Sequence, residues 1–177
     1  MRVRPSAPAV PVLAVIAIGA TLTAALSGQP AVPRPEFPQP QFERDLWMSL
    51  NGPWEFELDD ADVGIDEDWA RTARRFTRSI VVPFAVEHPR SGIGDPSFHP
   101  VVWYRRTFSL PPEWRGRRVL LKFGAVDYRA SVWVNGRLAG EHEGGHVPFG
   151  FDITPSIIAA SNTIVVRAED PPTDRYL

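Results

Sequence analysis

The sequence has 177 residues, a formal net charge of −2 and no cysteine. This length allows one domain with enough chain to bury a core, and the small net charge gives no reason to expect nucleic acid as a partner. The absence of cysteine excludes disulfides, thiol catalysis and zinc–thiolate sites.

The amino terminus is typical of a secretory signal peptide. Two arginines precede a mostly apolar run from Val10 to Leu26, and small residues around Ser27 offer a cleavage site. We therefore expect residues 1–27 to be removed, no stable membrane anchor, and a secreted, periplasmic or extracellular protein. The alternative is an uncleaved N-terminal anchor, since the apolar run approaches the roughly 18 residues that span a bilayer.

Residues 28–41 contain five prolines and few apolar side chains. This composition predicts an extended, Pro-rich linker with no core of its own. The folded domain is expected over residues 42–177.

The folded part alternates between apolar and polar residues in short segments separated by turn signals. Trp54 and Phe56 alternate with glutamates, which predicts a half-buried strand. Asn135-Gly136 supplies the two residues that a type I′ hairpin turn requires. Further strands are expected at 79–82, 102–110, 119–123, 130–134, 149–153 and 164–168. About eight strands and no long helix predict an all-β jelly-roll sandwich.

Six acidic residues lie between Asp59 and Asp68, just before Trp69. A calcium-binding loop is one interpretation, but the spacing lacks the ligand positions, central glycine and terminal glutamate of an EF-hand. We favour a solvated acidic loop with Trp69 packed back on the sandwich.

The segment from Glu87 to Pro100 is a long loop with three prolines and two glycines. Loops of this length without regular structure are uncommon and are often functional. Glu87, Arg90 and His99 are therefore candidate ligand contacts. The alternative is an ordinary surface loop.

The segment His142–His146 matches the zinc motif H-E-x-x-H letter for letter. That motif needs both histidines on one face of a helix. Two glycines within the turn would cost about 2 kcal/mol relative to alanine, and Pro148 follows almost at once. We expect a backbone bend here, no zinc site, and no metal or cofactor elsewhere in the chain.

Six tryptophans suggest a surface on which sugar rings stack. Those inside alternating strands are better explained as core residues, because large aromatic side chains usually fill a core. Trp47 and Trp114 lie outside these strands and are the better candidates for stacking on a sugar ring.

Six segments of the sequence carry a resemblance to a known family: LNGPWEF (50–56), VVPFAVE (81–87), VWYRRTF (102–108), RVLLKFGAVDYRASVWVNG (118–136), HEGGHVPFGFDIT (142–154) and NTIVVRAED (162–170). Together they resemble the N-terminal sugar-binding domain of family 2 glycoside hydrolases, which include β-galactosidases, β-glucuronidases and β-mannosidases. The resemblance covers residues 42–177 in the family's order and implies a galactose-binding-like jelly roll that binds carbohydrate and neighbours a catalytic barrel. It also implies that the loop from Glu87 to Pro100 lies towards the active site.

The catalytic residues of that family are not found in this sequence. Glycoside hydrolysis usually needs two carboxyl groups, which the family places on a (β/α)₈ barrel after this domain, with the acid/base glutamate following an asparagine. None of the three asparagines here precedes glutamate, and no strand–helix alternation predicts a barrel. The resemblance places the family's sugar-contacting aspartate beyond Leu177, so we expect a chain truncated before the final strands and the barrel, with no catalytic residue.

Three functions remain open at this point. The first is a non-catalytic carbohydrate-binding domain of a secreted family 2 glycoside hydrolase. The second is a free-standing secreted carbohydrate-binding module, and the third is a structural or interaction sandwich of the fibronectin or immunoglobulin kind. Only the first explains the segment HEGGHVPFGFDIT.

Overall fold

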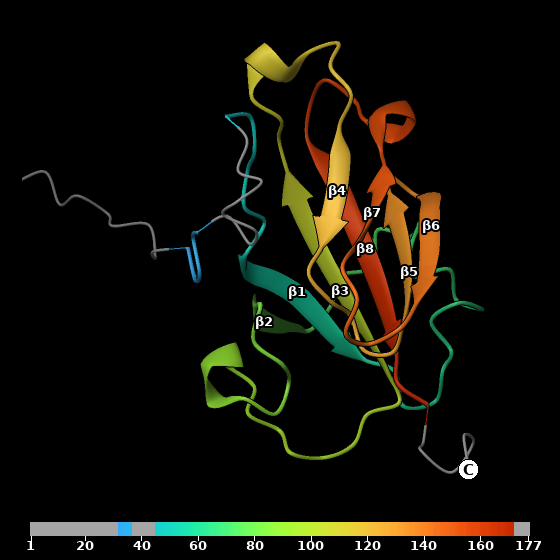
Figure 1. Cartoon of the computed structure of the whole chain (residues 1–177). Coiled ribbons are helices and arrows are strands. Elements are labelled where there is room, and N and C mark those ends of the chain that lie inside the picture. Colours follow the sequence, from blue (N-terminus) through green and yellow to red (C-terminus); the bar gives the residue numbers. More distant parts are fainter. Residues whose placement is uncertain (1–31, 37–44, 172–177) are drawn as a thin grey trace, which may run out of the picture. The chain divides into compact units, whose positions relative to one another are not determined.

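The computed structural model describes residues 32–36 and 45–171 (Figure 1). The predicted signal peptide lies outside the described residues, as does most of the predicted linker. No helix in these two ranges is long and apolar enough to cross a membrane.

The described residues form eight antiparallel strands in two sheets. The strands are β1 (Gly52–Leu58), β2 (Arg78–Val82), β3 (Val101–Phe108), β4 (Leu120–Phe123), β5 (Arg129–Val134), β6 (Arg137–Glu143), β7 (Phe149–Asp152) and β8 (Asn162–Glu169). One sheet has the order β2-β1-β3-β8-β5-β6 and the other pairs β4 with β7. Three short 3-10 helices lie in the connections: η2 (Pro89–Ser91), η3 (Pro112–Trp114) and η4 (Thr154–Ser156). The predicted all-β sandwich is confirmed.

The main core lies between the two sheets, where alternate residues of the large sheet point towards β4 and β7. Phe56, Val132 and Ile164 are fully buried there, and Leu121 of β4 packs against them from the opposite side. Burying one such side chain stabilises the fold by about 1.5–3 kcal/mol. The period-two alternation in the sequence therefore corresponds directly to this inner face.

A second core lies on the outer face of the large sheet, under the loop that connects β1 to β2. Trp103 is fully buried and stacks on Trp133, with ring centroids 5.5 Å apart. Trp69 and Phe76 of the loop cover these rings. The expectation that Trp69 packs back on the sandwich is confirmed, and loop 59–77 closes the outer face of β3.

The hairpin between β5 and β6 has the predicted turn. Asn135 and Gly136 have φ values of 50° and 75°, the positive region that a type I′ turn requires at both positions. The Asn135 side chain also donates hydrogen bonds to the carbonyl of Ser156 (2.7 Å) and to Oδ1 of Asn162 (2.8 Å). These bonds fix the turn against η4 and the start of β8.

Candidate functional site

One end of the sandwich gathers four segments that are far apart in the sequence (Figure 1). The backbone N–H of Asp170 donates to the carbonyl of Pro100 at 2.8 Å. Tyr128 donates its backbone N–H to Glu169 (3.0 Å) and accepts at its carbonyl from Gly144 (2.8 Å). We call this surface the loop end. Its segments are residues 83–100, 124–128, 144–148 and 170.

His99 is held between two carboxylates at the loop end. Its Nδ1 lies 2.8 Å from a carboxylate oxygen of Asp60, and its Nε2 lies 3.3 Å from one of Asp95. The side chain is 12% exposed. A ligand that contacts a ring nitrogen of His99 would therefore have to displace one of the two carboxylates.

The two carboxylates change the protonation of this histidine. Burial alone would lower the pKa of His99, but the hydrogen bonds and negative charges of Asp60 and Asp95 outweigh burial and raise it above its ordinary value. The hydroxyl and backbone N–H of Ser97, together with His99, lower the pKa of Asp95 to about 2. The cluster thus favours a charged imidazolium between two carboxylates.

The first part of the long loop is ordered by its own side chains. His88 accepts a hydrogen bond from the backbone N–H of Arg90 at 3.0 Å and so caps η2. The His88 ring also stacks on the Phe84 ring, with ring centroids 5.3 Å apart, and the Arg90 guanidinium lies 6.0 Å from the centre of the Phe84 ring. Arg90 and Glu87 are both exposed. The loop therefore presents them to solvent from a defined backbone.

Three carboxylates from different segments lie near one another at the loop end. Burial, then the charges of Asp127 and Glu87, raise the pKa of Asp170. Burial, then the charge of Glu87, raise the pKa of Tyr104 to about 12. A Cβ atom at Gly145 would collide with the carboxylate of Asp127, so this glycine makes room for the acidic side chain. The three carboxylates form no ion pair with any described residue.

The H-E-x-x-H segment is a strand end followed by a turn. β6 ends at Glu143, and Gly144 has a φ of 128°. The His142 ring stacks on Phe149 at 4.1 Å, with an angle of 14° between the rings. The backbone bend that the glycines predict is confirmed, and the two histidines do not share a helical face.

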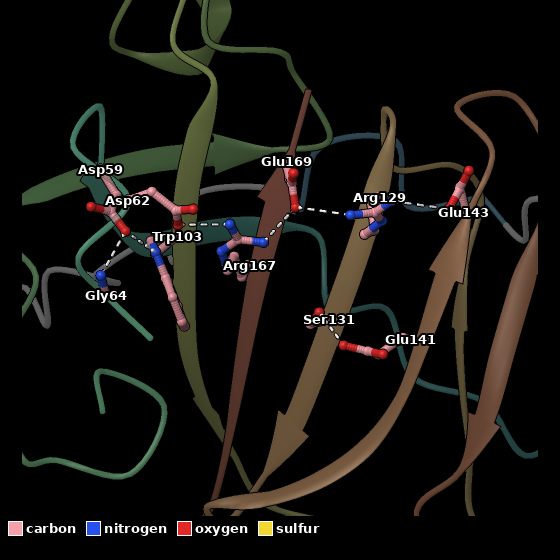
Figure 2. A network of polar contacts seen from close by, with 10 residues as sticks. All are labelled: Asp59, Asp62, Gly64, Trp103, Arg129, Ser131, Glu141, Glu143, Arg167 and Glu169. Atoms are coloured by element: carbon pink, nitrogen blue, oxygen red, sulfur yellow. Dashed lines mark hydrogen bonds and ion pairs between the residues drawn. The ribbon is translucent and has the colours of Figure 1, made fainter. Parts of the chain in front are cut away.

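The acidic loop after β1 forms specific bonds to the sheet. Asp62 pairs with Arg167 at 2.7 Å, and Arg167 pairs with Glu169 at 2.8 Å. Glu169 and Glu143 both pair with Arg129, at 3.5 and 3.2 Å. Figure 2 shows this line of alternating charges crossing β8, β5 and β6. The expected solvated acidic loop is therefore only partly correct.

Comparison with known proteins identifies the family. Residues 47–169 match the model of the family described as glycosyl hydrolases family 2, sugar binding domain. The chain belongs to this family. The β-glucuronidase of Felis catus is 35% identical over an alignment of 147 residues, and the match covers 72% of this chain and 23% of that protein. The β-glucuronidase of Paenibacillus borealis is 35% identical over an alignment of 124 residues, and the match covers 67% of this chain and 20% of that protein.

Solved structures agree with this assignment of a family 2 sugar-binding domain. The Lactobacillus rhamnosus β-glucuronidase has a TM-score of 0.64 and 31% identity, over 71% of this chain and 21% of that chain. A Ruminococcus gnavus β-glucuronidase in complex with D-glucuronic acid has a TM-score of 0.58 and 30% identity, over 70% of this chain and 21% of that chain. The chain spans about a fifth of the length of these relatives.

The structure of the family 2 domain places Glu87 and His99 at the loop end, and Arg90 on the same loop, in η2. Glu87 lies within electrostatic reach of Asp170, and His99 lies between its two carboxylates. No hydrogen bond or ion pair joins Glu87, Arg90 and His99 to one another within the described residues. Their role as ligand contacts stays a prediction.

Sequence reasoning missed two carboxylates of this surface, Asp127 and Asp170. Each lies directly beside a predicted strand: Asp127 precedes β5 and Asp170 follows β8. Because β5 and β8 are antiparallel, the start of one strand lies beside the end of the other. This pairing was the signal that could have placed the two carboxylates near each other. The two candidate tryptophans, Trp47 and Trp114, are both partly buried.

Proposed function

We propose that this chain is the non-catalytic carbohydrate-binding part of a secreted family 2 glycoside hydrolase, and that the loop end forms one side of its sugar pocket. The family match over residues 47–169 supports a sugar-binding role. The named relatives are β-glucuronidases roughly four to five times longer than the matched region, so the catalytic barrel would be supplied by sequence outside it.

The observation that carries the proposal is the group of uncompensated carboxylates at the loop end. Glu87, Asp127 and Asp170 come from three segments, and burial, then the charges of Asp127 and Glu87, raise the pKa of Asp170. Carboxylates accept hydrogen bonds from hydroxyl groups and are stronger acceptors than neutral oxygens. A sugar presents several hydroxyls at once, which suits a surface with several acceptors.

The remaining predicted contacts fit this arrangement in different ways. Arg90 is exposed and offers a hydrogen-bond donor on the same loop as Glu87. His99 is almost buried and bonded on both sides, so its first effect is to fix loop 83–100 to the loop after β1. We assign it a positioning role unless a ligand displaces Asp95, the more distant of its two partners.

Thermal unfolding of the 177-residue chain with a panel of mono- and oligosaccharides tests this proposal. A ligand that binds only the folded state raises the midpoint by mass action. We expect one class of sugar to raise it, with glucuronides the first to try because of the relatives' names. Glu87→Gln should reduce the shift, whereas Glu113→Gln, an exposed glutamate in η3, should leave it unchanged.

Two outcomes would contradict the proposal. A cooperative transition that no sugar shifts would remove the carbohydrate-binding role and favour a structural sandwich. Hydrolysis of a chromogenic β-glucuronide by this chain alone would refute a non-catalytic role. Tight binding of a polysaccharide without hydrolysis would favour the free-standing module.

A further inference from the structure

A hollow of about 300 Å³ opens at the opposite end of β5 from the loop end, beside the hairpin turn. Its walls come from the loop between β1 and β2, from the turn between β5 and β6, and from β3 and β8. Six of its lining residues matter here: Arg71, Thr72, Ala73, Arg105, Gly136 and Thr163. The volume is at the lower end of the range of small-ligand sites and suits a single sugar residue.

Arg105 places a buried positive charge at this hollow. The residue is 9% exposed. Its guanidinium donates to the carbonyls of Trp69 (2.6 Å) and Thr72 (3.2 Å) and to that of Arg74. It also lies 4.4 Å from the centre of the Phe76 ring. These are neutral partners, and Arg105 forms no ion pair with a described residue.

A neighbouring buried arginine, in contrast, has its charge compensated by two carboxylates. Arg167 is equally buried on the same face, but it pairs with Asp62 and Glu169 at 2.7 and 2.8 Å. Burial lowers the pKa of Arg105, and only the charge of Glu55 opposes it, from beyond ion-pair distance. An unpaired buried cation is costly, so a negative group bound in the hollow would offset part of that cost.

The rim of the hollow extends this positive character. Arg71 donates its Nε to the carbonyl of Gly136 at 3.0 Å and pairs with Asp68, yet 59% of its side chain stays exposed. The hydroxyls of Thr72 and Thr163 form no hydrogen bond with described residues. The site thus offers guanidinium groups for an anion and free hydroxyls for a polar ring.

We propose that this hollow binds an acidic saccharide, with the carboxylate of a uronate residue directed at Arg71 and Arg105 and its ring hydroxyls at Thr72 and Thr163. The preference for an anion stands on the two arginines alone. The choice of a sugar as the molecule that bears the anionic group rests on the proposed function. The loop end presents carboxylates, which accept hydrogen bonds from sugar hydroxyls, and it lies at the other end of β5, so the two sites are distinct.

The test is a titration of the ¹⁵N-labelled 177-residue chain, followed by two-dimensional NMR, with sodium glucuronate, sodium acetate and glucose as separate probes. Glucuronate should shift the amide signals of Ala73, Gly136 and Thr163. Acetate should shift them at higher concentration, and glucose should leave them unchanged. Glucuronate shifts confined to loop-end amides would overturn this inference while supporting the proposed function, and equal affinity for acetate would overturn the assignment to a sugar.

A matched pair of variants sharpens the result. Arg71→Ala should weaken glucuronate binding about tenfold, as expected for loss of one charge-assisted hydrogen bond. Arg75→Ala removes the same charge from an exposed residue of the same loop that does not line the hollow, and it should leave binding nearly unchanged. If both variants weaken binding equally, general charge attraction explains it and the assigned site is wrong.

Discussion

The carboxylate of Asp59 accepts a hydrogen bond from the indole nitrogen of Trp103 at 2.9 Å, beneath the loop that follows β1. Asp59 is 3% exposed and also accepts from the backbone N–H groups of Val63 (2.8 Å) and Gly64 (2.9 Å). A Cβ at Gly64 would lie 2.7 Å from the Trp103 ring. This single carboxylate therefore determines where the covering loop turns.

Asp59→Ala should lower the free energy of unfolding by about 2–4 kcal/mol, because two buried donors and one partly buried donor lose their acceptor. Each unsatisfied buried donor costs about 1–3 kcal/mol before the structure relaxes. Chemical denaturation with tryptophan fluorescence measures the change. Asp66→Ala is the matched control: Asp66 is an exposed aspartate of the same loop, and its removal should change the free energy by less than about 0.5 kcal/mol. Equal effects of the two substitutions would show that the loop is not anchored at Asp59.

Arg167→Met should destabilise the fold by about 1–3 kcal/mol. The substitution keeps the apolar stem but leaves Glu169, 23% exposed, without one of its cationic partners, and removing one member of a buried pair costs more than the pair contributes. Arg118→Met is the comparison, since Arg118 pairs with Asp152 while 72% exposed and exposed pairs are worth about 0–1 kcal/mol. A loss no larger at Arg167 than at Arg118 would mean that the line of charges in Figure 2 is fully screened by solvent.

The strands and the hairpin could be predicted from the sequence because their signals are local. Alternation along β1 and β3 specifies which residues face the core, and Asn135-Gly136 has the conformational freedom that its turn needs. The order of the family's segments then implied the sandwich. The alternation and the turn each depend on residues within a few positions of one another.

The partners of the charged residues could not be predicted, because they depend on the packing of distant segments. Asp59 and Trp103 are 44 positions apart, and His99 and Asp60 are 39 apart. The acidic loop was predicted to be solvated because its composition is polar, whereas its first aspartate, Asp59, is buried. The buried position of Arg105 at the hollow could not be predicted either, since in the sequence it is an ordinary polar residue of an alternating strand.

Gly140→Ala should destabilise the protein by about 1–3 kcal/mol, the usual cost of adding atoms to a packed core. A Cβ at this position in β6 would collide with the Phe151 ring of β7, so the glycine lets the two sheets approach at this edge. Gly124→Ala should be neutral or slightly stabilising, because nothing lies within 4 Å of the added atom and alanine restricts the unfolded chain. Thermal or chemical unfolding of both variants compares them, and a neutral Gly140→Ala would show that Phe151 moves aside without cost.

His99 should make stability depend on pH above its ordinary pKa. The folded-state pKa of His99 is raised by Asp60 and Asp95, so the folded state binds the proton more tightly than the unfolded chain does. Its contribution is complete below the unfolded pKa of about 6.5 and is lost as pH rises through the folded value. Free energies of unfolding measured between pH 5.5 and pH 8.5 (about one unit below and two above that value) should therefore fall with pH in the wild type and fall less in His99→Gln. His146→Gln is the control, because His146 is exposed at the same end of the sandwich and forms no hydrogen bond or ion pair with a described residue; this variant should keep the wild-type slope. A slope unchanged by His99→Gln would show that the two carboxylates do not hold the proton.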